Sequence, residues 1–227
     1  MSLLSRLPSV CVAMAVVVAG SAAFAETHIG GVTQTDYKGA MGAPAGGAAS
    51  ALYYANDVYS GERVTTPEAG STKLTFHDTT VLQIGANSSV VLDHFVYDPG
   101  SRTGDAAINF SKGIFRFVTG DIKNKSNVKL TTPTTSLTIR GTNFKIVVND
   151  AGTIVQVKSG YVEIKPCGGT AETRLVSPGE AVLVNAACNV SSVALSDVPT
   201  DPGTDGGGPN DGGPGHEPHG PPKRGGD

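Results

Sequence analysis

Short alternations of apolar and polar residues follow one another from Tyr53 to Val193, with little helical periodicity. KLTFHD (73–78), VLQIG (81–85), IFRFV (114–118) and FKIVV (144–148) are typical runs. β-branched and aromatic residues dominate the runs, and Gly, Pro, Asn or Asp separates most of them. The pattern therefore predicts an all-β domain.

Three segments share one local pattern of strand, tight glycine turn and strand. They are 108–117, 155–164 and 175–184, with Gly113, Gly160 and Gly179 in the turn of each. Glycine at this place supplies a positive φ in the turn. The irregular spacing indicates a recurring corner rather than a strict repeat, and such corners suit a stacked β-coil or a sandwich.

The segment TIRGTNF (138–144) shows a change of strand face. The apolar positions before it are odd-numbered (Leu137, Ile139), whereas those after it are even-numbered (Phe144, Ile146). Because side chains alternate with a period of 2 along a strand, the chain has changed face between them. Gly141 allows the sharp turn that this change requires without a Cβ clash.

Arg140 stands at this change of face and has several interpretations. Its guanidinium has five donors, which can satisfy backbone carbonyls that lose ladder partners at a corner. It can also pair with a carboxylate such as Asp121 or Glu163, or bind the carboxylate of a partner. We favour a structural role at the corner, with Thr142 and Asn143 bonding to nearby backbone.

The first 25 residues have the layout of a secretory signal peptide. An arginine precedes an apolar run from Val10 to Ala19, and small residues end in Ala23-Phe24-Ala25. This layout predicts cleavage between Ala25 and Glu26. The apolar run is too short to span a bilayer comfortably, which disfavours a membrane anchor, and no other segment suits one. We therefore expect export to the periplasm or secretion.

The rest of the chain divides into three parts by composition. Residues 26–52 predict a short strand and a loop rich in Gly and Ala, and residues 53–195 predict the β domain. Residues 196–227 are rich in Gly, Pro and Asp, with too few apolar residues to offset the entropy of ordering. We therefore expect a disordered C-terminal tail.

Two cysteines remain after the predicted cleavage, Cys167 and Cys188. A pair of cysteines in an exported chain predicts one disulfide, because oxidising compartments favour it. Two free thiols or a metal pair are the other interpretations, but no nearby histidine completes a metal site.

Charge and motifs limit the classes of function. Residues 26–195 contain 14 acidic and 14 basic residues, and such a balance argues against a nucleic-acid partner. The chain has no G-x-S-x-G, no H-E-x-x-H and no Gly-rich phosphate loop. The neighbours in His77-Asp78 and Asp93-His94 point to opposite faces of a strand, so neither pair is a ready-made dyad. We expect no enzyme activity, cofactor or metal.

Residues 56–184 resemble the FecR domain family. The matching segments are DVYSGERVTT (57–66), LTFHDTTVLQIGANSSVVLDHFVYD (74–98), GIFRFVTG (113–120), TPTTSLTIRGTNFKI (132–146), GTIVQVKSGYVEI (152–164) and LVSPGEAVLV (175–184). The most specific is TP-x(5)-IRGT-x-F, which here comprises Thr132, Pro133, Ile139, Arg140, Gly141, Thr142 and Phe144. The resemblance implies a strand-rich domain with the character of a short β-helix.

The best-known relatives use this domain as the periplasmic half of a transmembrane sigma regulator, which relays signals from a TonB-dependent transporter. This sequence lacks the cytoplasmic anti-sigma region and the transmembrane helix of that arrangement. The resemblance therefore implies a stand-alone, exported, non-catalytic module for protein interaction or signal sensing, with envelope proteins as partners. The other hypothesis is a structural or carbohydrate-associated envelope protein that binds polysaccharide.

Overall fold

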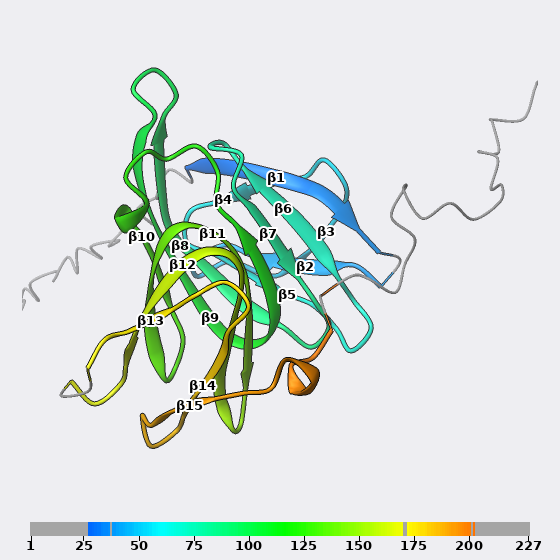
Figure 1. Ribbon diagram of the computed structural model, residues 1–227. Coiled ribbons are helices and arrows are strands. Elements are labelled where there is room, and N and C mark those ends of the chain that lie inside the picture. Colours follow the sequence, from blue (N-terminus) through cyan, green and yellow to red (C-terminus); the bar gives the residue numbers. More distant parts are fainter. Residues whose placement is uncertain (1–26, 37, 170–171, 201, 203–227) are drawn as a thin grey trace, which may run out of the picture.

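The computed structural model describes residues 27–36, 38–169, 172–200 and 202 (Figure 1). The predicted signal peptide, its cleavage between Ala25 and Glu26, and residues 203–227 of the predicted tail lie outside this part. The described chain is all-β, as predicted, with fifteen strands and two short 3₁₀ turns, η1 (Lys125–Asn127) and η2 (Leu195–Asp197). Within these residues no helix has the length and apolar character to cross a membrane.

The fifteen strands form one mixed sheet that folds over itself into two facing layers (Figure 1). Three long strands pass from one layer to the other: β9 (Thr103–Val118), β11 (Thr135–Asn149) and β12 (Gly152–Pro166). β9 parallel to β10 is the one parallel pairing among the described strands, and all the others are antiparallel.

Layer 1 contains, from edge to edge, β13 (Arg174–Val176), the end of β12, the start of β11, β10 (Val128–Thr131), the start of β9, β8 (Ser89–Asp98), β5 (Glu62–Thr65), β2 (Ala40–Ala43) and β3 (Ser50–Leu52). Layer 2 contains β15 (Val190–Ser192), β14 (Ala181–Asn185), the start of β12, the end of β11, the end of β9, β7 (Val81–Ile84), β6 (Thr72–Phe76), β1 (His28–Thr35) and β4 (Asp57–Tyr59).

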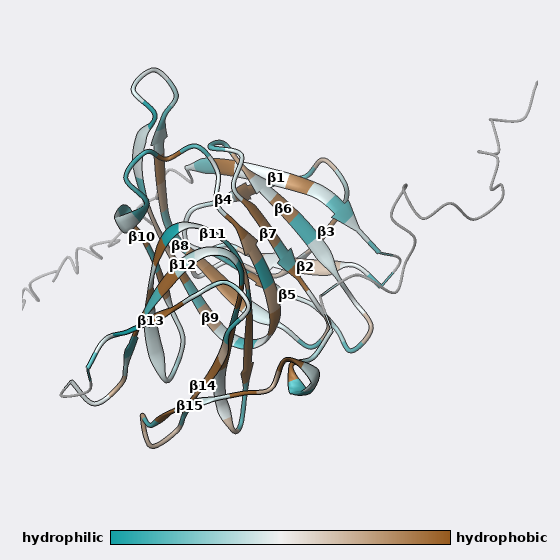
Figure 2. Ribbon diagram, in the orientation of Figure 1, coloured by the Kyte–Doolittle hydropathy of each residue, from teal (hydrophilic) through white to brown (hydrophobic). Residues whose placement is uncertain are grey.

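The inner faces of the two layers share one hydrophobic core, which Figure 2 shows as brown positions alternating along the strands. Phe76 of layer 2 stacks on Phe95 of layer 1 with ring centroids 5.0 Å apart. Phe110 and Phe115, on the two arms of β9, meet at 4.7 Å. Each such pair adds about 0.5–1.5 kcal/mol beyond area burial, so phenylalanines hold the layers together in a chain without tryptophan.

The expected short β-helix is not confirmed. Successive coils of a β-helix pair their strands in parallel, whereas nearly all the described pairings here are antiparallel. The predicted glycine corners are present at the bends between the layers: Gly141 (φ 65°) in β11, Gly160 (φ 74°) in β12 and Gly179 (φ 83°) between β13 and β14. Gly113 (φ 118°) bends β9 at the opposite end of the sheet.

The predicted change of face in β11 also occurs in its partner strand. Ile139 pairs with Val162 before the bend, and Phe144 pairs with Val157 after it, and all four side chains are buried. Between these pairs the register shifts once on each strand, so both strands bend together and the later pairing is restored. The hairpin therefore contributes to both layers.

Cys167 and Cys188 form the predicted disulfide, with Cα atoms 5.1 Å apart. It ties the end of β12 to the turn between β14 and β15. The two cysteines are 21 residues apart, and on the chain-entropy model a loop of this size contributes roughly 3 kcal/mol. The tie therefore fixes the end of layer 1 that carries β13.

Two segments at the predicted domain boundaries contact the rest of the sheet. β1, β2 and β3, which lie before residue 53, are strands of the same sheet as the later ones. The segment after Leu195, expected to be disordered, packs on layer 2 as far as it is described: Val198 is buried, and Lys145 donates to the carbonyl of Pro199 at 2.6 Å. Pro202 lies against Gly85 at the end of β7.

Two glycine substitutions should separate backbone strain from a clash. A Cβ at Gly141 meets only open space, so Gly141→Ala should cost about 1 kcal/mol through its left-handed backbone alone. A Cβ at Gly160 overlaps the carbonyl of Gly141, so Gly160→Ala should cost about 3 kcal/mol or more. Urea unfolding measures both values, and equal losses would show that the two bends are not in contact.

Truncation should show where the folded domain ends. A chain ending at Leu195 loses the burial of Val198 and the bond to Lys145, so its free energy of unfolding should fall by about 1–3 kcal/mol. A chain ending at Pro202 should match the full chain. Urea unfolding of the full chain and both truncated chains measures this. An unchanged midpoint for the chain ending at Leu195 would show that the folded domain ends there, as expected from the sequence.

Candidate functional site

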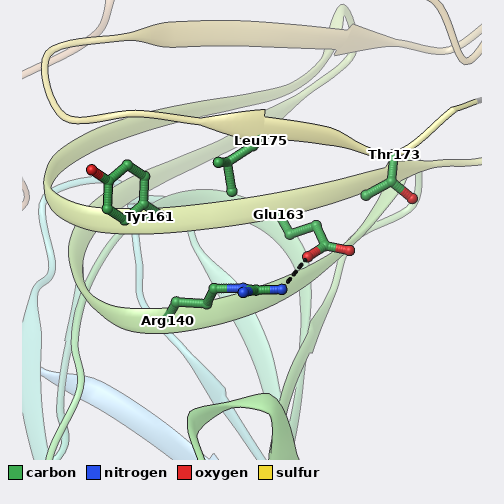
Figure 3. A pocket seen from close by; sticks show the side chains of 5 residues that line it. All are labelled: Arg140, Tyr161, Glu163, Thr173 and Leu175. Atoms are coloured by element: carbon green, nitrogen blue, oxygen red, sulfur yellow. Dashed lines mark hydrogen bonds and ion pairs between the residues drawn. The ribbon is translucent and has the colours of Figure 1, made fainter.

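A groove of about 400 Å³ lies on the outer face of layer 1, next to the bend in β11 and β12 (Figure 3). It is called the Arg140 groove below. Its lining residues come from three neighbouring strands and the segment that leads into the last of them: Arg140, Tyr161, Glu163, Thr173 and Leu175.

Strand register brings these side chains together. Arg140 of β11 lies directly opposite Tyr161 of β12, and Glu163 lies directly opposite Leu175 of β13. Directly opposed residues on one face of an antiparallel pair have Cβ atoms about 5 Å apart, so they interact. The core-facing neighbours Ile139 and Val162 alternate with them, which turns the groove residues outward.

One ion pair crosses the groove. Arg140 donates from Nη2 to Oε2 of Glu163 at 3.1 Å (Figure 3), with the two side chains 66% and 35% exposed. An exposed pair of this kind contributes roughly 0–1 kcal/mol to stability. The pair therefore presents two opposite charges to solvent rather than holding the fold together.

This placement answers the question that the sequence left open for Arg140. Of the two carboxylates considered, Glu163 is its partner, and Asp121 is not. The guanidinium is therefore described with a carboxylate, and no described hydrogen bond joins it to a carbonyl of the corner. The Thr142 carbonyl at the bend instead accepts from the backbone N–H and hydroxyl of Thr119.

The other residues of the bend are structural. Ile139 and Phe144 are fully buried on either side of it, and Gly141 provides the left-handed turn. The backbone N–H of Thr142 donates to the Thr119 hydroxyl at 2.9 Å, while its own buried hydroxyl has no partner among the described residues. Asn143 accepts from Arg116 and not from backbone.

Thr132 and Pro133 lie at the far end of layer 1, away from the groove, in the turn between β10 and β11. The Thr132 hydroxyl accepts from the backbone N–H of Thr135 at 3.1 Å and lies 2.8 Å from the hydroxyl of Thr153, which is fully buried. Thr134 donates to Thr153 and to the carbonyl of Val184. This part of the signature therefore ties the turn to both layers.

The Arg140 groove is bordered by an open sheet edge. β13 pairs with β12 on one side, and no described strand pairs with its other side. Leu175 on this strand is 50% exposed, and Tyr161 beside it is 47% exposed. An open edge with apolar and charged side chains next to it can add a strand from another chain.

Strand pairing also places two histidines beside aspartates that are not their neighbours in the sequence. Nε2 of His94 lies 2.7 Å from Oδ1 of Asp105, and Nε2 of His28 lies 3.1 Å from Oδ1 of Asp57. All four side chains are about half exposed, and no described hydrogen bond joins either pair to a Ser, Thr or Cys. In the described part of the chain, no group of three or more His, Cys, Asp or Glu suits a metal ion.

The solved structures that are similar to this chain include two crystal structures of proteins from Parabacteroides distasonis ATCC 8503 that are described as anti-sigma factors. They share 16% and 15% sequence identity with this chain, with TM-scores of 0.47 and 0.45. Each comparison covers 58% of this chain and 59% of the other, so the chain spans about three fifths of their length. No curated protein matches the chain.

The family comparison bears directly on the resemblance found in the sequence. The FecR protein family matches residues 62–163, from the start of β5 to the Glu163 side of the Arg140 groove. This range contains the whole bend of β11 and β12 and the complete TP-x(5)-IRGT-x-F segment. The expected resemblance is therefore confirmed: residues 62–163 of this chain match the FecR protein family.

Proposed function

We propose that this protein is an exported, non-catalytic FecR-type module that senses signals by binding an envelope protein at the Arg140 groove. The carrying observation is the groove itself: an open edge strand stands beside exposed Leu175 and Tyr161, and an exposed ion pair crosses the floor. Interfaces are enriched in Tyr and Arg, and this groove presents both.

The match to the FecR family supports a regulatory role through protein contact. It includes three of the five groove residues, Arg140, Tyr161 and Glu163, and places the edge strand β13 directly beside the matched domain. The partner would add an extended segment to β13, with backbone hydrogen bonds along the edge. Its outward-facing side chains would then meet Leu175 first, and the Arg140–Glu163 pair lies beyond Leu175 on the next two strands.

Location in the periplasm, or secretion from the cell, is part of the same proposal. Its support is the signal-like pattern of residues 1–25, and the disulfide fits an oxidising compartment. The non-catalytic role is supported by the exposure of both histidine–aspartate pairs and by the absence of catalytic motifs from the sequence.

A charged residue at the groove should abolish partner recovery without unfolding the domain. Leu175→Arg places a guanidinium on the apolar wall, and Val96→Arg is the matched control, because Val96 on β8 is also 50% exposed. In affinity capture from envelope fractions, including cells grown with limiting iron, Leu175→Arg should recover at least about tenfold less of the parent's partner. Val96→Arg should match the parent, and both variants should keep the parent's melting temperature.

Arg140→Ala adds a second measurement on the same samples. The exposed ion pair predicts a loss of less than about 1 kcal/mol in the free energy of unfolding, with weaker partner recovery. A large loss in the free energy of unfolding with unchanged partner recovery would show that Arg140 stabilises the fold and does not bind the partner. If the protein binds purified peptidoglycan or exopolysaccharide and captures no protein from any fraction, the carbohydrate-associated hypothesis is favoured instead.

A further inference from the structure

The outer face of layer 1 contains a second hollow, here called the His94 pocket. Its volume is about 500 Å³, which lies within the range of small-molecule sites. It is formed by β8, β9, η1 and β10, and its lining residues are His94, Asp105, Ala106, Ala107, Asn127 and Lys129. None of these residues lines the Arg140 groove, so the two hollows are separate surfaces.

A small residue between two long ones makes this hollow. His94 of β8 and Lys129 of β10 lie directly opposite Ala107 of β9, one on each side of it. Ala106 and Ile108 are buried, so Ala107 faces outward. The methyl group of Ala107 therefore forms a low floor between an imidazole and an ammonium group.

Two oxygen acceptors of the pocket come from side chains that their neighbours hold in place. Oδ1 of Asp105 lies 2.7 Å from Nε2 of His94, and Asn127 donates from Nδ2 to the carbonyl of Gly104 at 3.1 Å. Asp105 Oδ2 and Asn127 Oδ1 accept no hydrogen bond from a described residue. Both oxygens can accept from hydroxyl groups, and because their side chains are already oriented, binding costs little further side-chain entropy.

Two ammonium groups of the same outer face have no partner in the described part of the chain. The side chains of Lys129 and Lys165 make no hydrogen bond or ion pair with a described residue, whereas Asp105 and Glu163 each already have a cationic partner. Asp93, at the margin of the face, accepts from the side-chain amide of Asn109 at 3.5 Å. The lysines are therefore open to an anionic ligand.

A strip of hydroxyl residues joins the two lysines. Lys129 lies opposite Thr138 of β11, and Ser136 of β11 lies opposite Lys165 of β12. The lysines are thus two strands apart across the sheet and two residues apart along it, which places their Cα atoms about 12 Å from each other. An extended ligand can reach both ammonium groups and exchange hydrogen bonds with the hydroxyls between them.

These groups fit a hydroxyl-rich chain that carries carboxylates. A bare carboxylate or phosphate has no hydrogen to donate to Asp105 or Asn127, whereas a sugar can donate there through hydroxyls while its carboxylate accepts from lysine. An acidic peptide has no strand edge to join here, because β9 and β10 are both paired on two sides. The interior position in the sheet therefore favours saccharide over polypeptide.

We propose that the His94 pocket and the strip from Lys129 to Lys165 bind an acidic polysaccharide of the uronate class. One carboxylate pairs with Lys129 and a later one with Lys165, while hydroxyl groups of the sugar in the pocket donate to Asp105 and Asn127. This inference goes beyond the proposed function, because the ligand is a saccharide and the surface is separate from the Arg140 groove.

The test titrates tetragalacturonate into the ¹⁵N-labelled chain and follows the backbone amide signals. The signals of Ala107, Asn127 and Lys129 should shift. Neutral maltotetraose and a tetraglutamate peptide should each bind at least about tenfold more weakly, because each lacks one of the two kinds of contact. No shift with tetragalacturonate, or equal binding of either comparison ligand, would overturn the proposal.

Lysine variants test the charge contact. Lys129→Gln should raise the dissociation constant of tetragalacturonate by about tenfold, because a charge-assisted hydrogen bond is lost. Lys73→Gln is the matched control: it removes the same charge from β6 on the outer face of layer 2 and should leave the affinity unchanged. An equal loss in both variants would mean unspecific charge attraction and overturn the proposal.

Ala107→Met tests the shape of the pocket without changing its charge. The longer side chain fills the floor, so tetragalacturonate should bind several-fold more weakly. Because position 107 faces outward, the melting temperature should stay that of the parent. Unchanged affinity in this variant would overturn the placement of the sugar in the His94 pocket.

Lys165→Gln tests the length of the site. It should weaken tetragalacturonate several-fold and leave the affinity of digalacturonate unchanged, because the shorter ligand occupies only the pocket. Unchanged affinity for tetragalacturonate would overturn the extension of the site to β12.

Discussion

Close contact between neighbouring strand bends is the constraint on which this structure depends. β11, β12 and the β13–β14 connection turn between the layers side by side, and each has a glycine with positive φ at the turn. The bends touch: the carbonyl of Gly141 lies where a Cβ at Gly160 would be, and Gly179 donates to the carbonyl of Val157 at 2.9 Å. A side chain at Gly160 would overlap this carbonyl, so glycine at this position lets the two bends lie in contact.

The same bends build the surface that the proposed function uses. Because Ile139 and Val162 must face the core just before the bend, their neighbours Arg140 and Tyr161 face solvent. β13 then lies beside β12 as a short open edge, with the disulfide holding the end of β12 that precedes it. The segment TIRGTNF thus has two roles: its glycine and apolar residues shape the fold, while its arginine belongs to the outer surface.

Local patterns predicted the strands, the glycine corners, the change of face in β11 and the disulfide, because each depends on a few residues of one segment or on cysteine usage. Features that depend on long-range register were not accessible. Arg140 is 23 residues from Glu163, and only the pairing of β11 with β12 selects it over Asp121. The expected β-helix is not confirmed. In the sequence, a glycine corner has the same pattern in parallel coils and in bent antiparallel strands. The contacts of Val198 and Pro199 were not predicted, because both residues lie in a segment whose composition resembles a disordered tail.

Native-state hydrogen exchange on β11 tests most directly whether the glycine bends make the two layers one cooperative unit. Slowly exchanging amides on both sides of Gly141 should open with the same free energy, equal to that of global unfolding. In Gly160→Ala, which strains the contact between the bends, both groups should lose the same amount. Separate opening energies for the two arms, with only one arm affected by the substitution, would contradict the account, because each layer would then be stable without the bends that join them.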